Sequence, residues 1–230
     1  MPESYVPLAG RRQAVTIVFA AIAVVCAAAV VVDIADLAIL DRLIAGENVT
    51  DAELNADDER MRLVGLLQFA GLIAGAIVFI RWMHGAYRNV DVVAPQERRY
   101  GHGWAIGSWF VPFLNLWRPK QIANDIWRAG GSGGPGALLW LWWTVFVVSN
   151  WAANIAIRSY LSDDSTEDLR TGTIAYMISD GLDVVGAILA VLVVRAATDR
   201  LDGRAAAIEV PPAPTDDGWA APERPAGVPA

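Results

Sequence analysis

The sequence predicts an all-α, polytopic membrane protein with four transmembrane helices and a further Trp-rich segment on the cytoplasmic side. Three observations support this fold class. Of the 230 residues, 55% are hydrophobic, whereas soluble domains contain about 45–50%. The apolar residues are gathered into a few long blocks, and the segments that connect these blocks differ sharply in charge.

Four blocks of apolar sequence occupy residues 14–32, 63–80, 137–157 and 171–194. The first and third blocks carry no charge, the second contains Gln68 as its one strongly polar residue, and the fourth contains Asp180 and Asp183. A helix needs about 20 mostly apolar residues to cross a bilayer. We therefore expect transmembrane helices over about residues 14–40, 63–82, 137–158 and 171–195.

The first block has two possible interpretations, because Arg11 and Arg12 precede it as basic residues precede the core of a signal peptide. A signal core is about 7–15 residues long, and this block runs for at least nineteen. We therefore prefer a transmembrane helix. Cys26 lies within it and is the one cysteine of the chain, so it has no internal disulfide partner. It is expected to pack as a small apolar residue.

The connecting segments predict the orientation of the spans. Residues 41–62 contain three Arg and seven acidic residues, and residues 158–170 contain two Arg and four acidic residues. Residues 81–136 instead carry seven Lys or Arg. Cytoplasmic segments are enriched in Lys and Arg because positive charge resists translocation. We expect a multi-pass protein of the plasma membrane, with both termini and residues 81–136 in the cytoplasm.

The middle segment contains an uncharged stretch from Gly103 to Trp117. As a helix, these fifteen residues would reach only about 22 Å, less than the roughly 30 Å of a hydrocarbon core. Basic residues flank the stretch on both sides, at Arg98, Arg99, Arg118 and Lys120. The stretch should therefore return to the cytoplasmic face, either as a re-entrant segment with Pro112 near its turn or as a segment lying in the interface.

Eight of the ten Trp residues fall near the predicted cytoplasmic boundary, at positions 82, 104, 109, 117, 127, 140, 142 and 143. One interpretation is that they only anchor the helices, since amphipathic rings favour the interface. The other is a groove for a lipid or ligand at that face. After Pro119, Ile122 and Ile126 share one face of a short amphipathic helix, which we expect on the membrane surface.

The same segment carries a motif of four parts: Gly-Trp-Ala, then Trp-Phe-x-Pro, then Asn-x-Trp-x-Pro, then Trp-Arg. The residues are Gly103, Trp104, Ala105, Trp109, Phe110, Pro112, Asn115, Trp117, Pro119, Trp127 and Arg128. This motif resembles that of a bacterial, largely actinobacterial, membrane family, domain of unknown function 4328. The resemblance implies a membrane protein, extends to the flanking spans over roughly residues 60–200, and implies no activity.

Polar side chains within the spans form the second candidate site: Asp33, Asp36, Gln68, Asn150, Asn154, Arg158, Asp180 and Asp183. Ionisable groups inside a membrane are costly and by default suggest function. From the helix directions, all should lie between the midplane and the outer surface. We expect Asp33, Asp180 and Arg158 to approach one another. The cluster is then either a polar network that joins the helices or a cation or proton site that opens outward.

Other classes of function lack support in the sequence. Two histidines and one cysteine provide no clear metal cluster or nucleophile–base pair, so we expect no cofactor, no metal and no enzyme activity. No concentrated basic patch indicates nucleic-acid binding. The favoured function is a membrane-embedded interaction or scaffolding module that binds lipid or a protein partner. The alternative is a small transporter or channel subunit that uses the outer carboxylates.

The chain is expected to have three parts. Residues 1–13 form a cytoplasmic tail, and residues 14–204 form the four-helix membrane domain with the Trp-rich segment 103–129. Residues 205–230 are rich in Pro and Ala and are expected to be disordered. Besides the lipid bilayer, the expected partner is another membrane protein or a second copy of the chain.

Overall fold

The computed structural model describes residues 4–131, 136–162 and 165–208. These residues contain no strand, and four long helices dominate them: α1 (Ala9–Ile44), α2 (Asp51–Val93), α5 (Ala137–Ser162) and α6 (Thr166–Ala207). Each contains a window long and apolar enough to cross a membrane. The predicted all-α, polytopic fold with four spans is confirmed.

Three of the helices extend well beyond the expected spans. At about 1.5 Å per residue, the 43 residues of α2 measure about 64 Å, twice the thickness of a hydrocarbon core of about 30 Å. Helix α6 likewise continues to Ala207, past the boundary expected at residue 204, and the predicted tail from 209 onward lies outside the described residues. Hydrophobicity marks where a helix enters lipid, whereas capping and local packing decide where it ends.

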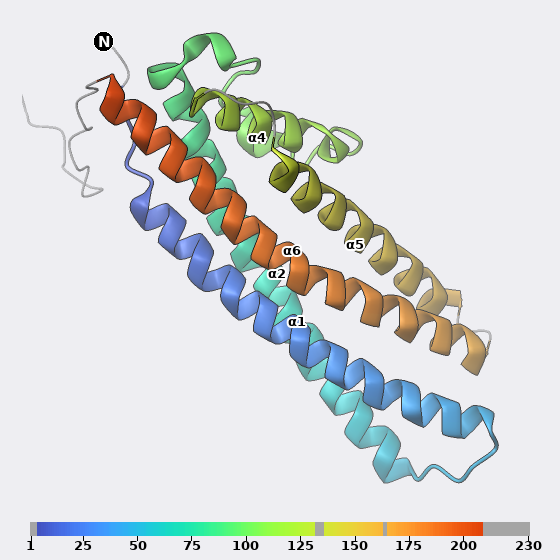
Figure 1. Cartoon of the computed structure of the whole chain (residues 1–230). Coiled ribbons are helices and arrows are strands. Elements are labelled where there is room, and N and C mark those ends of the chain that lie inside the picture. The colour runs from blue at the N-terminus through green and yellow to red at the C-terminus, as the bar shows by residue number, and fades with distance from the viewer. Residues whose placement is uncertain (1–3, 132–135, 163–164, 209–230) are drawn as a thin grey trace, which may run out of the picture.

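The four long helices run side by side as one elongated bundle (Figure 1). Helix α6 packs against both α1 and α5, and α1 also packs against α2. The start of α1, the end of α6 and the segment between α2 and α5 lie at one end of the bundle, here called the tail end. The α1–α2 and α5–α6 connections lie at the other end, here called the loop end.

Helices α1 and α6 are antiparallel, and polar contacts join them near both ends. At the tail end Arg12 of α1 donates to Asp199 of α6 at 2.5 Å, and the Tyr5 hydroxyl, just before α1, donates to Asp202 at 2.5 Å. At the loop end the Arg170 guanidinium donates to Asp41 at 2.7 Å. These contacts fix which residues of the two helices face each other, and therefore which intramembrane carboxyls meet.

The turn at the loop end is closed by a capping box at the start of α2. The Thr50 hydroxyl accepts from the Glu53 backbone N–H at 3.3 Å, and the Glu53 carboxylate accepts from the Thr50 backbone N–H at 2.9 Å. Arg42 at the end of α1 donates to the same carboxylate at 2.8 Å. The hydrogen bond from Arg42, followed by those from Thr50, lowers the pKa of Glu53 from 4.5 to about 2.

Titration of Glu53 tests this closure. A carboxyl whose pKa is depressed in the folded state stabilises the fold above its ordinary pKa, and this contribution is lost as the pH falls from 4.5 toward 2. Arg42→Ala should raise the Glu53 pKa, measured by carbon NMR of the carboxyl group, because the strongest donor is removed. Thr50→Val is the matched control and should raise it less. Equal shifts in the two variants would show that Arg42 is not the main cause of the low pKa of Glu53.

An aromatic core fills the tail half of the bundle. The Phe79 ring lies 5.5 Å from Trp82, 5.8 Å from Trp109 and 5.6 Å from Trp142, measured between ring centroids. The Trp82 indole N–H donates to the Thr198 hydroxyl at 3.0 Å. Several Trp residues placed at the interface from the sequence are therefore core residues, namely Trp82, Trp127, Trp142 and Trp143.

The segment between α2 and α5 folds at the tail end without crossing the bundle (Figure 1). It contains the short helices η1 (Pro95–Glu97), α3 (Trp104–Gly107), η2 (Leu114–Leu116) and α4 (Arg118–Ala129). Helix α4 buries Ile122 and Ile126, as its pattern predicts, and packs against α2, α5 and α6. It is therefore an integral part of the fold, and its predicted position at the membrane surface stays a prediction.

Candidate functional site

Five aspartates line the contact of α1, α2 and α6 in the loop half of the bundle, and we call them the carboxyl ladder: Asp33, Asp36, Asp57, Asp180 and Asp183. Asp33 and Asp180 are only 5% and 6% exposed. Asp36 and Asp57 are also buried, and Asp183 is half-buried. Such burial of carboxyls is unusual because their charged forms are costly to desolvate.

The deeper half of the ladder lies between α1, α2, α5 and α6. The Asp33 and Asp180 carboxyls are close enough to interact with each other. The Gln68 amide donates to Asp180 at 2.7 Å, and the Ser149 hydroxyl donates to Asp183. The side chains of four different helices therefore converge on this part of the ladder.

The outer half of the ladder continues toward the loop end. The buried Thr173 hydroxyl donates to Asp36 at 2.7 Å, and the Asp36 and Asp57 carboxyls interact with each other. Asp57 pairs with Arg60 at 2.7 Å, and Arg60 is about half exposed. The ladder thus begins at a solvent-accessible cation and leads inward along the α1–α6 contact.

The depth of the ladder follows from the apolar blocks. Ala23 is at the centre of the block 14–32, and Asp33 lies ten residues further along α1, a rise of about 15 Å. That distance equals about half of a hydrocarbon core. Asp183 is at the centre of the block 171–194. The ladder therefore extends from the edge of the hydrocarbon core to its middle and ends there, because the tail half is filled by the aromatic core.

The charge of the ladder is not balanced by basic side chains. Among the described residues, Arg60 is the one cation that pairs with it, whereas Asp33, Asp36, Asp180 and Asp183 form no ion pair. The Asp33 Oδ2 atom is buried and receives no hydrogen bond from a donor. Two facing carboxylates repel strongly in a medium of low dielectric constant. A shared proton or a bound cation would remove this repulsion.

The expected approach of Arg158 to Asp33 and Asp180 is wrong. Arg158, Asn150 and Asn154 are exposed on α5, and Arg158 forms no ion pair with a described residue. The amides of Asn150 and Asn154 donate to backbone carbonyls one turn earlier on their own helix. The i, i+4, i+8 spacing correctly placed the three residues on one face, but that face points away from α1 and α6.

Several members of the site were missed by sequence reasoning. Asp57 was counted in the acidic segment 41–62, and Ser149, Thr173 and Ser179 were not distinguished from the other small residues of the apolar blocks. Cys26 was expected to pack among apolar groups, yet its thiol lies beside Asp180 and Asp183. An antiparallel pairing of α1 and α6 could have identified two of them, because it sets Cys26 opposite Asp183 and Thr173 opposite Asp36.

The Trp-rich motif at the tail end splits into exposed and buried parts. Trp104, Phe110, Pro112 and Trp117 are exposed, Trp109, Asn115 and Arg128 are half-buried, and Pro119 and Trp127 are buried. Phe113 has a φ of 65°, and the Leu114 N–H donates to the Pro112 carbonyl at 2.8 Å, which makes a strained γ-turn. This turn presents Phe110 and Phe113, which are 73% and 75% exposed, on the surface.

A polar network holds this segment to the end of α2. Asp125 of α4 is fully buried. It accepts hydrogen bonds from Arg99 at 2.7 Å, from Arg128, and from the Tyr87 hydroxyl at 3.3 Å. Burial raises the pKa of Tyr87 to about 12, so this phenol remains a donor. The Tyr87 hydroxyl also accepts from the Tyr100 backbone N–H at 2.9 Å, and the network therefore links α2, α4 and the chain between them.

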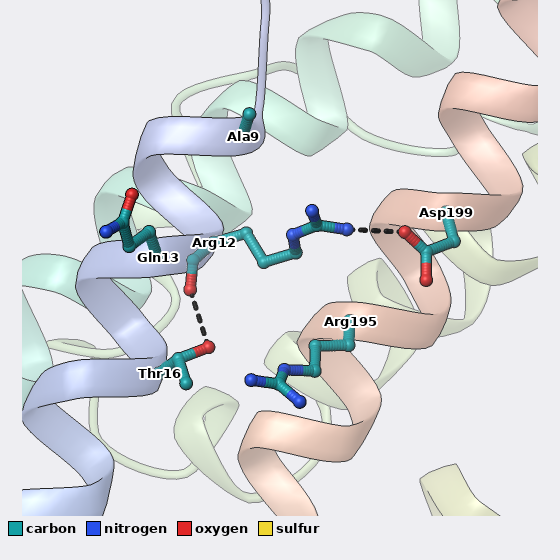
Figure 2. A pocket seen from close by; sticks show the side chains of 6 residues that line it. All are labelled: Ala9, Arg12, Gln13, Thr16, Arg195 and Asp199. Atoms are coloured by element: carbon teal, nitrogen blue, oxygen red, sulfur yellow. Dashed lines mark hydrogen bonds and ion pairs between the residues drawn. The ribbon is translucent and has the colours of Figure 1, made fainter.

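Cations surround the exposed aromatic residues. The Arg118 guanidinium lies 4.7 Å from the Trp104 ring centroid, and the Lys120 ammonium lies 3.3 Å from that of Trp140. A hollow of about 470 Å³ between α1 and α6 is lined by Ala9, Arg12, Gln13, Thr16, Arg195 and Asp199. Figure 2 shows Arg12 and Arg195 extending into it, with Arg12 paired to Asp199 at 2.5 Å. The hollow is basic and lies at the opposite end from the carboxyl ladder.

The fold and both sites define a multi-pass, α-helical membrane protein with buried carboxyls in one half and an aromatic surface at one end. The family described as "Domain of unknown function (DUF4328)" matches residues 45–199, more than half of the chain, and the chain belongs to this family. The match includes α2, α5 and most of α6, but not α1 with Cys26 and Asp33. No curated protein and no solved structure gives a significant match.

Proposed function

We propose that the protein is a small transporter or channel subunit that binds a proton or a small cation at the carboxyl ladder, and that its role is not enzymatic. The observation that carries this proposal is the facing pair of buried carboxyls, Asp33 and Asp180, with no basic partner among the described residues. Intramembrane carboxyls without counter-ions are typical of proton relays and ion pathways.

A purely structural role for the ladder is the less favoured explanation. Hydrogen bonds between transmembrane helices contribute only about 0.6 kcal/mol on average, and the same helices could be joined by Ser, Thr and Asn without burying a charge. Gln68 and Ser149 do stabilise individual carboxylates. These uncharged side chains do not balance the negative charge of the carboxylates, and a bound cation would do so.

The orientation of the site supports uptake from outside the cell. The acidic loops 41–62 and 158–170 and the basic segment 81–136 favour a cytoplasmic tail end and an external loop end. In this orientation, in the plasma membrane of a bacterium, the ladder opens outward. The aromatic core separates the ladder from the cytoplasm. A conformational change in the tail half is therefore needed before an ion can pass from the ladder to the cytoplasm.

Infrared spectroscopy of the protein in lipid tests whether the ladder holds a proton. We expect a carbonyl band from a protonated carboxyl group at neutral pH, because Asp33 and Asp180 face each other without a basic partner. Asp180→Asn should remove this band, whereas Asp58→Asn, at an exposed aspartate beside Asp57, should retain it. If wild type and Asp180→Asn give the same spectra, both at neutral pH and after addition of small cations, the ladder binds neither.

A second function, engagement of anionic lipid at the tail end, is supported by a separate observation. The γ-turn at Phe113 presents two exposed phenylalanines, and Arg118, Arg12 and Arg195 are close to the same end of the bundle. Apolar side chains inserted below a ring of basic residues are typical of binding to a membrane with negatively charged headgroups. This function corresponds to the interaction module that the sequence favours.

Quenching by brominated lipids measures how deeply the Trp-rich segment lies. Variants that retain one tryptophan, either Trp104 or Trp117, should be quenched most strongly by bromine placed high on the acyl chain, because both side chains are partly exposed at the tail end. A variant that retains only the buried Trp82 should be quenched less. Quenching of Trp104 and Trp117 from opposite leaflets would show that the segment crosses the membrane.

A further inference from the structure

Three potential metal ligands meet at the inner end of the carboxyl ladder. The Cys26 sulfur and one carboxylate oxygen each from Asp180 and Asp183 all lie within 4.8 Å of one another. Cys26 and Asp180 are buried, and Asp183 is half-buried. The three side chains come from two helices, α1 and α6, whose relative position is fixed by polar contacts at both ends.

We propose that Cys26, Asp180 and Asp183 form a binding site for a divalent transition-metal ion of the zinc class. This inference rests on the proposed function, since it names the cation that the ladder takes up. It concerns the deepest part of the ladder, near the middle of the hydrocarbon core. It differs from the expectation from the sequence that the chain binds no metal.

The spacing of the donors suits a tetrahedral ion. Zinc binds thiolate sulfur at about 2.3 Å and carboxylate oxygen at about 2.0–2.2 Å, so neighbouring ligand atoms are separated by roughly 3.5 Å. The three donor atoms are already within 4.8 Å, and side-chain rotation closes the remaining distance. A water molecule fills the fourth tetrahedral position, as in zinc sites with three protein ligands.

Two independent features point to a ligand at this position. The Asp33 carboxyl interacts with Asp180, yet its Oδ2 atom is buried and has no hydrogen-bond donor. The Asp33 side chain is only 5% exposed. In addition, two of the carboxylates are positioned by hydrogen bonds: Gln68 donates to Asp180 at 2.7 Å, and Ser149 donates to Asp183. Ligands of protein metal sites are commonly oriented by such outer hydrogen bonds.

The chemistry of the donors selects the class of ion. A thiolate favours zinc and related transition metals, whereas magnesium and calcium prefer sites made only of oxygen. On binding, the Cys26 thiol gives up its proton and forms a sulfur–metal bond, and the proton leaves along the ladder to the loop end. The double positive charge of the ion then offsets the negative charge of the carboxylates, which the protein does not balance with basic residues.

Titration of the full chain in detergent with Co²⁺ provides a direct test, because cobalt replaces zinc and its thiolate complex absorbs in the near ultraviolet. We expect a thiolate-to-cobalt absorption band with one equivalent of Co²⁺, its loss on addition of Zn²⁺, and no competition from Mg²⁺. Cys26→Ser should abolish the band, and Asp183→Asn should weaken Co²⁺ binding at least about 10-fold, the effect typical of a lost metal-site interaction. Asp58→Asn should bind as the wild type does.

The outcomes separate this inference from the function on which it rests. Absence of the band in the wild-type protein, or its persistence in Cys26→Ser, would overturn the metal site. Helical circular dichroism of Cys26→Ser that matches the wild type shows that its loss of binding is local. If the infrared carboxyl band depends on Asp180 while no Co²⁺ band forms, the ladder binds protons only, and the metal site is refuted while the proposed function stands.

Discussion

Among single substitutions of polar residues at the tail end, Asp125→Ala should lower the free energy of unfolding most. Asp125 is fully buried and accepts hydrogen bonds from Arg99, Arg128 and Tyr87. Removing one partner of a buried ion pair typically costs about 3–5 kcal/mol, because the remaining charges are left without compensation. Both arginines are partly exposed, so we expect the lower end, about 3 kcal/mol.

Glu97→Ala is the matched control for this substitution. Glu97 accepts from Arg128 at 2.8 Å, but both side chains are about one-third exposed, and exposed ion pairs contribute at most about 1 kcal/mol. Unfolding by denaturant in detergent micelles, followed by Trp fluorescence, compares the two variants, since Trp127 lies on the same helix as Asp125. If Asp125→Ala costs no more than Glu97→Ala, the network does not hold α4 in place.

The four spans could be predicted from the sequence because transfer into lipid depends on local composition. Each apolar block lies within a helix of the structure. Helix ends were less predictable, since α2 begins at a capping box formed by Thr50 and Glu53, far outside its apolar block. Such caps require only a few residues and leave the average hydropathy unchanged.

The carboxyl ladder could be predicted in part. Spacing alone placed Asp33 with Asp36, and Asp180 with Asp183, on shared helix faces, and charge asymmetry placed them in one half of the membrane. Which helix supplies a counter-ion depends on how each helix is rotated about its axis, and hydropathy does not determine that rotation. Arg158 was therefore assigned to the ladder although its face of α5 points away.

The tail end shows the same limit for aromatic residues. Tryptophan residues are on average enriched at the membrane interface. Trp82 and Trp142 instead pack around Phe79 in the core. Likewise, the amphipathic pattern of α4 alone would place Asp125 on its polar face. It is buried because Arg99 and Tyr87, distant in sequence, fold over it. Contacts between segments that are far apart in the chain decided these positions.

Asp180→Asn should abolish the transport activity while preserving the fold. The substitution removes the carboxylate that faces Asp33, yet an Asn side chain still offers an oxygen to accept the hydrogen bond from Gln68. Shape and helix packing are thus retained, and removal of a buried charge should not destabilise the bundle. Asp58→Asn removes one exposed carboxylate near the same end and controls for the change in net charge.

Flux into proteoliposomes is the measurement that tests the central claim most directly. Vesicles that contain wild-type protein are compared with vesicles that contain Asp180→Asn or Asp58→Asn, at equal protein content and under an imposed membrane potential. An enclosed pH-sensitive dye reports protons, and radiolabelled Na⁺ and Zn²⁺ report cations. The account predicts flux of at least one of these ions with wild type and Asp58→Asn, and the level of protein-free vesicles with Asp180→Asn. Equal flux in wild-type and Asp180→Asn vesicles, or no flux above protein-free vesicles for any ion, would contradict it.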